Sequence, residues 1–98
     1  MSRKADIKKM VQIVVAEQLN GISFQLFLFG SQSNLAAFKN ADIDIGIDAE
    51  RQLTATEINS IKSKLDDLPT LYGFDIVDFN KVTNNFKNIA LQNIELIV

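Results

Sequence analysis

Two periodicities of apolar and polar residues alternate along the chain and predict helices and strands in turn. Over residues 5–19, apolar side chains recur at helical spacing, and the Asn-Gly pair at 20–21 follows where a helix C-cap would lie. The stretch SFQLFLF at 23–29 is almost wholly apolar, as in a buried strand. The Gly-Ser pair at 30–31 ends that strand, and a short helix is expected from there to about residue 37.

The second half of the chain continues this alternation. The run ADIDIGID places isoleucine at every second position, which predicts a strand over 42–47 with one apolar and one acidic face. Thr54 and Glu57 have the spacing of a capping box and begin a helix that Pro69 ends. GFDIVDF predicts a third strand over 73–79. A last helix running toward the C-terminus is expected from four apolar residues: Phe86, Ile89, Ala90 and Ile94.

These elements predict a single α/β domain over residues 1–98. The sequence contains no repeat, linker or low-complexity segment. A chain of this length buries roughly two-thirds of its unfolded surface, which is enough for one hydrophobic core. The helices are expected to cover the isoleucine side of the second strand and to leave its aspartates on the other side.

Composition and charge exclude several classes of function. The formal charge is −2 and the sequence has no basic face, so nucleic acid is not expected as the primary partner. Cysteine and histidine are both absent, which excludes disulfides, thiolate nucleophiles, ordinary zinc sites and an imidazole base. No apolar run approaches the ~20 residues of a membrane span, and the start lacks the apolar region of a signal peptide. We therefore expect a cytoplasmic protein.

Carboxylates are the strongest candidates for chemistry. In a strand, Asp42 and Asp44 point the same way with Cα atoms roughly 6.6 Å apart, and two carboxylates held that close favour a shared cation such as Mg²⁺. Asp75 lies on the side of its strand away from Phe74 and Ile76 and could complete a cluster of three carboxylates. The alternative is that this face of the sheet is solvated and its aspartates are surface residues.

Four further residues are weaker candidates. The amide groups of Gly30 and Ser31 could hold a phosphate at a helix start, although a tight strand-to-helix turn is the alternative. Asp78 ranks behind Asp75 because it falls on the Phe74 side and near the strand end, where a solvated aspartate is the alternative. Asp48 shares the face of Asp44 but lies farther along the strand, so a surface role is expected.

The sequence resembles a known family over essentially its whole length. The run LFLFGSQSNLAAFKNADIDIGID is similar to the nucleotidyltransferase signature of the DNA polymerase beta superfamily, an apolar strand, Gly-Ser, a spacer and two alternating aspartates. GFDIVDF resembles the strand with that family's third carboxylate. The small size resembles the minimal nucleotidyltransferases, which implies a mixed β-sheet flanked by helices.

The resemblance also implies roles for particular residues. Asp42 and Asp44 would hold Mg²⁺, two ions with a nucleotide bound, and Asp75 would be the third metal ligand and the base. The nucleotide-binding residues would be Gly30, Ser31, Gln32 and Lys39.

The sequence departs from the family pattern in the loop before the second strand. Gln32 stands where the family usually has arginine, Leu35 where it has a small residue and Ala41 where it often has serine. Glutamine cannot neutralise a phosphate as guanidinium does, so these departures weaken the case for tight triphosphate binding.

Function follows from the resemblance as a hypothesis with alternatives. Minimal nucleotidyltransferases are commonly encoded beside a small helical HEPN-type protein and can act as its antitoxin. We expect transfer of AMP from ATP to a hydroxyl of such a partner in a hetero-oligomer. One alternative is a catalytically impaired module that binds the helical partner without turnover, and another is a regulator that binds Mg²⁺ and ATP without forming product. Phe24, Leu26 and the tail at 96–98 could form an apolar interface or belong to the core.

Overall fold

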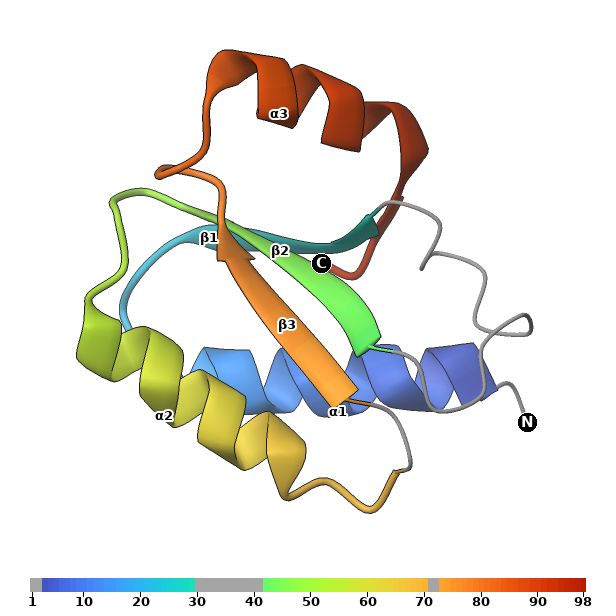
Figure 1. The fold of residues 1–98 in the computed structure, drawn as a ribbon. Coiled ribbons are helices and arrows are strands. Elements are labelled where there is room, and N and C mark those ends of the chain that lie inside the picture. Colours follow the sequence, from blue (N-terminus) through green and yellow to red (C-terminus); the bar gives the residue numbers. More distant parts are fainter. Residues whose placement is uncertain (1–2, 30–41, 71–72) are drawn as a thin grey trace.

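The computed structural model describes residues 3–29, 42–70 and 73–98, which form a mixed four-stranded sheet with helices on both faces (Figure 1). The mixed sheet flanked by helices confirms the predicted fold, whereas the short helix expected over 30–37 lies outside the described residues. In chain order the elements are α1 (Arg3–Gln18), β1 (Phe24–Phe29), β2 (Asp42–Ala49), α2 (Ala55–Asp66), β3 (Gly73–Asp78), α3 (Asn84–Ala90), the 3-10 turn η3 (Leu91–Asn93) and β4 (Ile94–Leu96).

The strands lie in the order β3-β2-β1-β4. β1 pairs antiparallel with both β2 and β4, while β2 and β3 run parallel. A parallel pair needs a crossover connection, and α2 lies in the connection between β2 and β3. The mixed pairing therefore places the two aspartate-bearing strands side by side and parallel, with β3 at one edge of the sheet and β4 at the other.

The main core lies between the sheet and the pair of helices α1 and α2 (Figure 1). Ile43, Ile45 and Ile47 are fully buried there, as the alternation in β2 predicted. Gly21 follows α1 with φ of 87°, a conformation that glycine adopts without the steric cost of a Cβ atom. Leu19, which directly follows α1, joins this core, and the helices contribute six buried residues to it: Ile7, Val11, Val14, Val15, Ile61 and Leu65.

The start of α2 has the predicted capping box. The Thr54 hydroxyl accepts a hydrogen bond from the Glu57 backbone N–H at 3.1 Å, and the Glu57 carboxylate accepts one from the Thr54 N–H at 2.8 Å. Both interactions satisfy N–H groups that a helix start leaves without intrahelical partners. The spacing of Thr54 and Glu57 in the sequence therefore located the start of α2 correctly.

A smaller aromatic cluster lies on the opposite face of the sheet, beneath α3. Phe27 and Phe29 of β1 each contact Phe79 edge to face, with ring centroids 4.7 and 5.5 Å apart. Phe86 of α3 lies against Phe29 and Phe79 at 6.1 and 6.2 Å. The face expected to be lined with aspartate is thus covered in part by rings and a helix.

The predicted last helix is wrong in its extent. α3 ends at Ala90, and Ile94 instead begins β4, where it pairs with Phe29. Phe86 and Ile89 are 42% and 68% exposed, so the apolar residues do not form a buried helical stripe. β4 supplies hydrogen-bond partners for the backbone N–H and C=O groups along one edge of β1. The two strands are far apart in sequence, so the local apolar periodicity does not indicate this pairing.

Candidate active site

The parallel pairing of β2 and β3 brings two of the predicted carboxylates together. Asp44 lies directly opposite Asp75, and Asp42 lies opposite Gly73. Asp44 is half-buried and Asp75 is exposed, and both alternate with buried residues of the α1–α2 face. Adjacent strands are about 4.8 Å apart, so the carboxylates of Asp44 and Asp75 lie within reach of one shared ligand.

The donor set of this pair fits a hard divalent cation. Two carboxylates supply the oxygen ligands that Mg²⁺ takes, and a cation between them would offset their mutual repulsion. Within the described part of the chain, no group of three or more His, Cys, Asp or Glu side chains gathers closely enough to hold a metal. The side chain of Asp42 lies outside that part, as do Gly30, Ser31, Gln32 and Lys39.

Gly46 limits the acidic face of β2 on the side toward α3. It lies opposite Phe27, and a Cβ atom at Gly46 would lie 2.3 Å from Cε2 of that ring. The ring therefore occupies the place of a side chain between Asp44 and Asp48. Asp48 lies beyond it in an ion pair with Lys87 of α3, N to O 4.0 Å. Asp44 is thus separated from Asp48, which joins α3 to the sheet.

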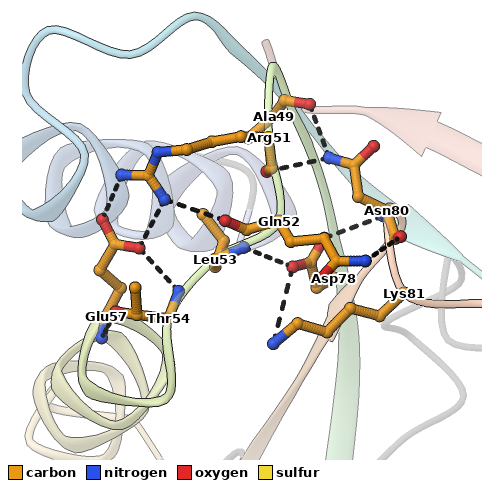
Figure 2. Close-up of polar contacts among 9 residues, drawn as sticks. All are labelled: Ala49, Arg51, Gln52, Leu53, Thr54, Glu57, Asp78, Asn80 and Lys81. Atoms are coloured by element: carbon orange, nitrogen blue, oxygen red, sulfur yellow. Dashed lines mark hydrogen bonds and ion pairs between the residues drawn. The ribbon is translucent and has the colours of Figure 1, made fainter.

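Asp78 has a structural environment that the sequence analysis did not anticipate (Figure 2). It is only 5% exposed, and its carboxylate accepts hydrogen bonds from the backbone N–H groups of Leu53 at 2.7 Å and Asn80 at 2.9 Å. The alternative given for Asp78, a solvated strand-end aspartate, is therefore wrong. The bond to the residue two positions on is an Asx-turn, which the sequence Asp-Phe-Asn could have indicated.

Asn80 links the end of β3 to the segment that follows β2, and we call Asp78 and Asn80 together the bracket (Figure 2). Its side-chain amide donates to the carbonyls of Ala49 at 2.7 Å and Arg51 at 3.0 Å, and its own carbonyl accepts from the Gln52 side chain at 3.1 Å. Together with Asp78, this residue ties the connection after β2 to the end of β3. Since a slip of one residue would turn every side chain to the other face, the bracket supports the register that sets Asp44 opposite Asp75.

Arg51 and Glu57 form a second polar contact beside this bracket. The guanidinium donates to both oxygens of the carboxylate, at 2.9 and 2.8 Å. The hydrogen bond from Arg51, with that from the Thr54 backbone, lowers the pKa of Glu57 to about 2. Because Arg51 is exposed, we assign this pair to the start of α2 and not to the site.

A mixed, helix-flanked sheet with carboxylates in register on parallel strands is the arrangement that the sequence resemblance implies for a nucleotidyltransferase. The family model described as polymerase beta, nucleotidyltransferase matches residues 7–98. The chain belongs to this family.

Solved structures of toxin-antitoxin complexes have the same fold. One is the complex of a tri-AMPylated HEPN toxin with MNT antitoxin from Shewanella oneidensis, with TM-score 0.75, 17% identity and coverage of 97% of this chain and 71% of that chain. Another is a toxin-antitoxin with AMP-PNP, with TM-score 0.77, 19% identity and coverage of 93% and 72%. At these identities the likeness shows the fold.

No curated protein matches the chain. Within the residues that the structure describes, no helix is long and apolar enough to cross a membrane.

Proposed function

We propose that this protein is a Mg²⁺-dependent nucleotidyltransferase that moves AMP from ATP to a hydroxyl of a partner protein. The observation that carries the proposal is the pairing of Asp44 with Asp75 in a chain of the nucleotidyltransferase family. Structures of the same fold contain an AMPylated toxin in one case and AMP-PNP in another, which supports the choice of nucleotide.

The proposed ligands of Mg²⁺ are Asp42, Asp44 and Asp75. When bound, the metal would neutralise charge that develops on the phosphates during transfer. The triphosphate would be held by the nucleotide-binding residues that the sequence indicates: Gly30, Ser31, Gln32 and Lys39. The carboxylates would thus fix the reacting phosphate, and positioning would supply most of the rate enhancement.

The proposed reaction exchanges one oxygen for another at the α-phosphorus. The hydroxyl oxygen of the partner attacks this phosphorus, the bond to the oxygen that bridges to the β-phosphate breaks, and pyrophosphate leaves. Asp75 accepts the proton of the hydroxyl. Asp75 suits this role because it is exposed on β3, an edge strand that a second protein can approach.

The proposed partner is a small helical HEPN-type protein in a hetero-oligomer, with this chain as its antitoxin. We propose that residues 1–98 form a single nucleotidyltransferase domain, because the family match spans 7–98 and one sheet joins the described segments. One core of this size leaves little room for a separate acceptor site. The acceptor hydroxyl would therefore come from the partner.

The test compares the label position in ATP and three aspartate variants. The protein is incubated with Mg²⁺ and lysate of its host, with ATP labelled on the α-phosphate or on the γ-phosphate. Transfer labels a protein band from the α-position alone, and Asp44→Asn and Asp75→Asn each lower it by about a hundredfold or more, equivalent to several kcal/mol of transition-state stabilisation. Asp48→Asn is the matched control and retains activity, because its carboxylate pairs with Lys87. Unchanged labelling by both site variants contradicts the proposal.

A second candidate function is binding of the helical partner without turnover. Gln32 and Leu35, which replace the family's usual arginine and small residue, favour it. A partner that co-purifies equally with the wild type and the Asp44→Asn variant, with no labelled band from either, supports this function. In that case Gln32→Arg with Leu35→Gly tests whether the loop alone prevents transfer.

A further inference from the structure

Exposed apolar side chains gather at the C-terminal end of the described chain. Seven large apolar residues are at least 38% exposed among the described residues, and Ile13 on α1 is the one that lies elsewhere. The other six define what we call the C-terminal apolar face: Phe86, Ile89, Leu91, Ile94, Leu96 and Val98. Exposed apolar residues that gather in one segment of the chain indicate an interaction site more often than scattered ones do.

The strand pairing and one ring contact connect three residues of this face. Ile94 and Leu96 pair with Phe29 and Phe27, so they lie on the side of the sheet that α3 covers. Phe29 in turn contacts Phe86 of α3. Figure 1 shows the chain descending from α3 to the C-terminus beside β1. Phe86 of the helix and Ile94 and Leu96 of the edge strand therefore lie around the same two rings of β1.

The charges within residues 84–98 are satisfied by the protein's own side chains. This stretch has two charged residues, Lys87 and Glu95. Lys87 pairs with Asp48, and Glu95 forms a salt bridge with Lys8 of α1. A surface with no charge beyond these pairs complements another uncharged surface, and two copies of it do not repel each other when they meet.

The backbone of β4 adds a second reason for a symmetric contact. Among the strands that the structure describes, β4 pairs with β1 and forms one edge of the sheet. An edge strand is a template for pairing with another strand. Two identical strands that pair antiparallel are related by a two-fold axis, so the same residues serve on both sides, as in the commonest homo-oligomers.

We propose that the C-terminal apolar face is the dimer interface of this protein, with β4 of one copy antiparallel to β4 of a second copy. The two sheets would then continue across the axis, and the apolar residues of β4 and α3 would be covered by their counterparts. β3 lies at the opposite edge of each sheet, so Asp44 and Asp75 would stay accessible in the dimer. The proposal does not depend on the transferase activity.

The test is the mass of the purified full chain in solution, measured by sedimentation over a wide concentration range. We expect a dimer in reversible equilibrium. Leu96→Lys, which places a charge at the proposed axis, weakens dimerisation on the order of thirtyfold or more, the scale of a central interface residue. Ile13→Lys makes the same change at the exposed apolar residue on α1 and leaves the dimer intact.

Two further variants keep the test decisive. Ile89→Lys disturbs the face from α3 and should act in the same direction if Leu96→Lys fails to fold. Asp44→Asn should remain dimeric, so loss of transfer and loss of dimerisation are separable. A monomer at every concentration, assembly that grows without stopping at two copies, or equal dissociation by Ile13→Lys and Leu96→Lys would each overturn the proposal. A monomer that dimerises only with a helical partner present would overturn it as well.

Discussion

Asp75 and Asp78 are three residues apart in β3 and have contrasting surroundings. Asp75 is exposed on the α3 side of the sheet and lies opposite Asp44. Asp78 is buried on the side of the main core and accepts two backbone hydrogen bonds. Two carboxylates of one short strand are thus placed against another carboxylate in one case and against N–H donors in the other.

This difference shows what determines the role of an aspartate. A carboxylate with backbone donors is satisfied by the fold, and its removal leaves those donors unpaired in the interior. A carboxylate opposite another carboxylate is repelled by its neighbour, and a cation held between the two would offset that repulsion. We therefore assign Asp78 to stability and keep Asp75 as the residue proposed for chemistry, a contrast that mutation of either residue can break.

The largest expected effect is on stability, at Asp78. Asp78→Ala leaves the N–H groups of Leu53 and Asn80 without their acceptor, so we expect the free energy of unfolding to fall by about 3 kcal/mol. Asp75→Ala should change it by no more than about 0.5 kcal/mol, as is usual at exposed positions. Urea unfolding of the two variants and the wild type measures both values. A larger loss for Asp75→Ala than for Asp78→Ala would reverse the assignment.

A smaller effect is expected at Gly46, which separates the acidic residues of β2. Gly46→Ala places a methyl group against three atoms of the Phe27 ring at 2.3 to 2.9 Å, so we expect overpacking to cost about 2 kcal/mol of stability. Phe27→Leu in the same chain should relieve part of this cost, and thermal unfolding of the single and double variants measures the coupling. Additive losses would show that the ring does not determine the requirement for glycine.

Local patterns in the sequence predicted much of the fold. The alternation in β2 located its buried isoleucines, and the Thr54–Glu57 spacing located the start of α2. The alternation of apolar and acidic residues in β2 and β3 also indicated that the side chains of Asp44 and Asp75 lie on the same face of the sheet. Each of these features depends on neighbours within a few residues, which a single sequence displays directly.

The features that the sequence did not predict depend on distant contacts. Ile94 continues an apolar helical periodicity, but it pairs with Phe29, 65 positions earlier in the chain. Its extended conformation therefore follows from pairing with β1. Asp78 is buried where it accepts a hydrogen bond from the N–H of Leu53, 25 positions earlier in the chain. The aromatic cluster over the acidic face likewise joins strands and a helix that are far apart in sequence. Long-range pairing overrides local preference in each case.

The smallest expected effect on stability is at Glu57, a carboxylate at the surface that pairs with Arg51. Its pKa in the folded protein is about 2, mainly because Arg51 donates to it, and lies below the value of about 4.3 for glutamate in an unfolded chain. The stability that the pair contributes is therefore complete above that unfolded value and is lost as the pH falls toward 2. Glu57→Gln keeps an acceptor for the Thr54 N–H but removes the charge, so it isolates the ion pair from the helix cap.

The expected result for Glu57 is a difference that depends on pH. Thermal unfolding should show Glu57→Gln slightly less stable than the wild type at about pH 7, because exposed ion pairs contribute little, and the gap should close as the pH approaches about 2. Arg51→Gln is the matched control, since it removes the donor that lowers the pKa of Glu57 and should reduce the same pH dependence. A gap that stays constant from neutral to acid pH would mean that the charge of Glu57 does not stabilise the fold. The helix cap would then be the sole contribution of Glu57, and partnered carboxylates would stabilise this protein only where they are buried, as at Asp78.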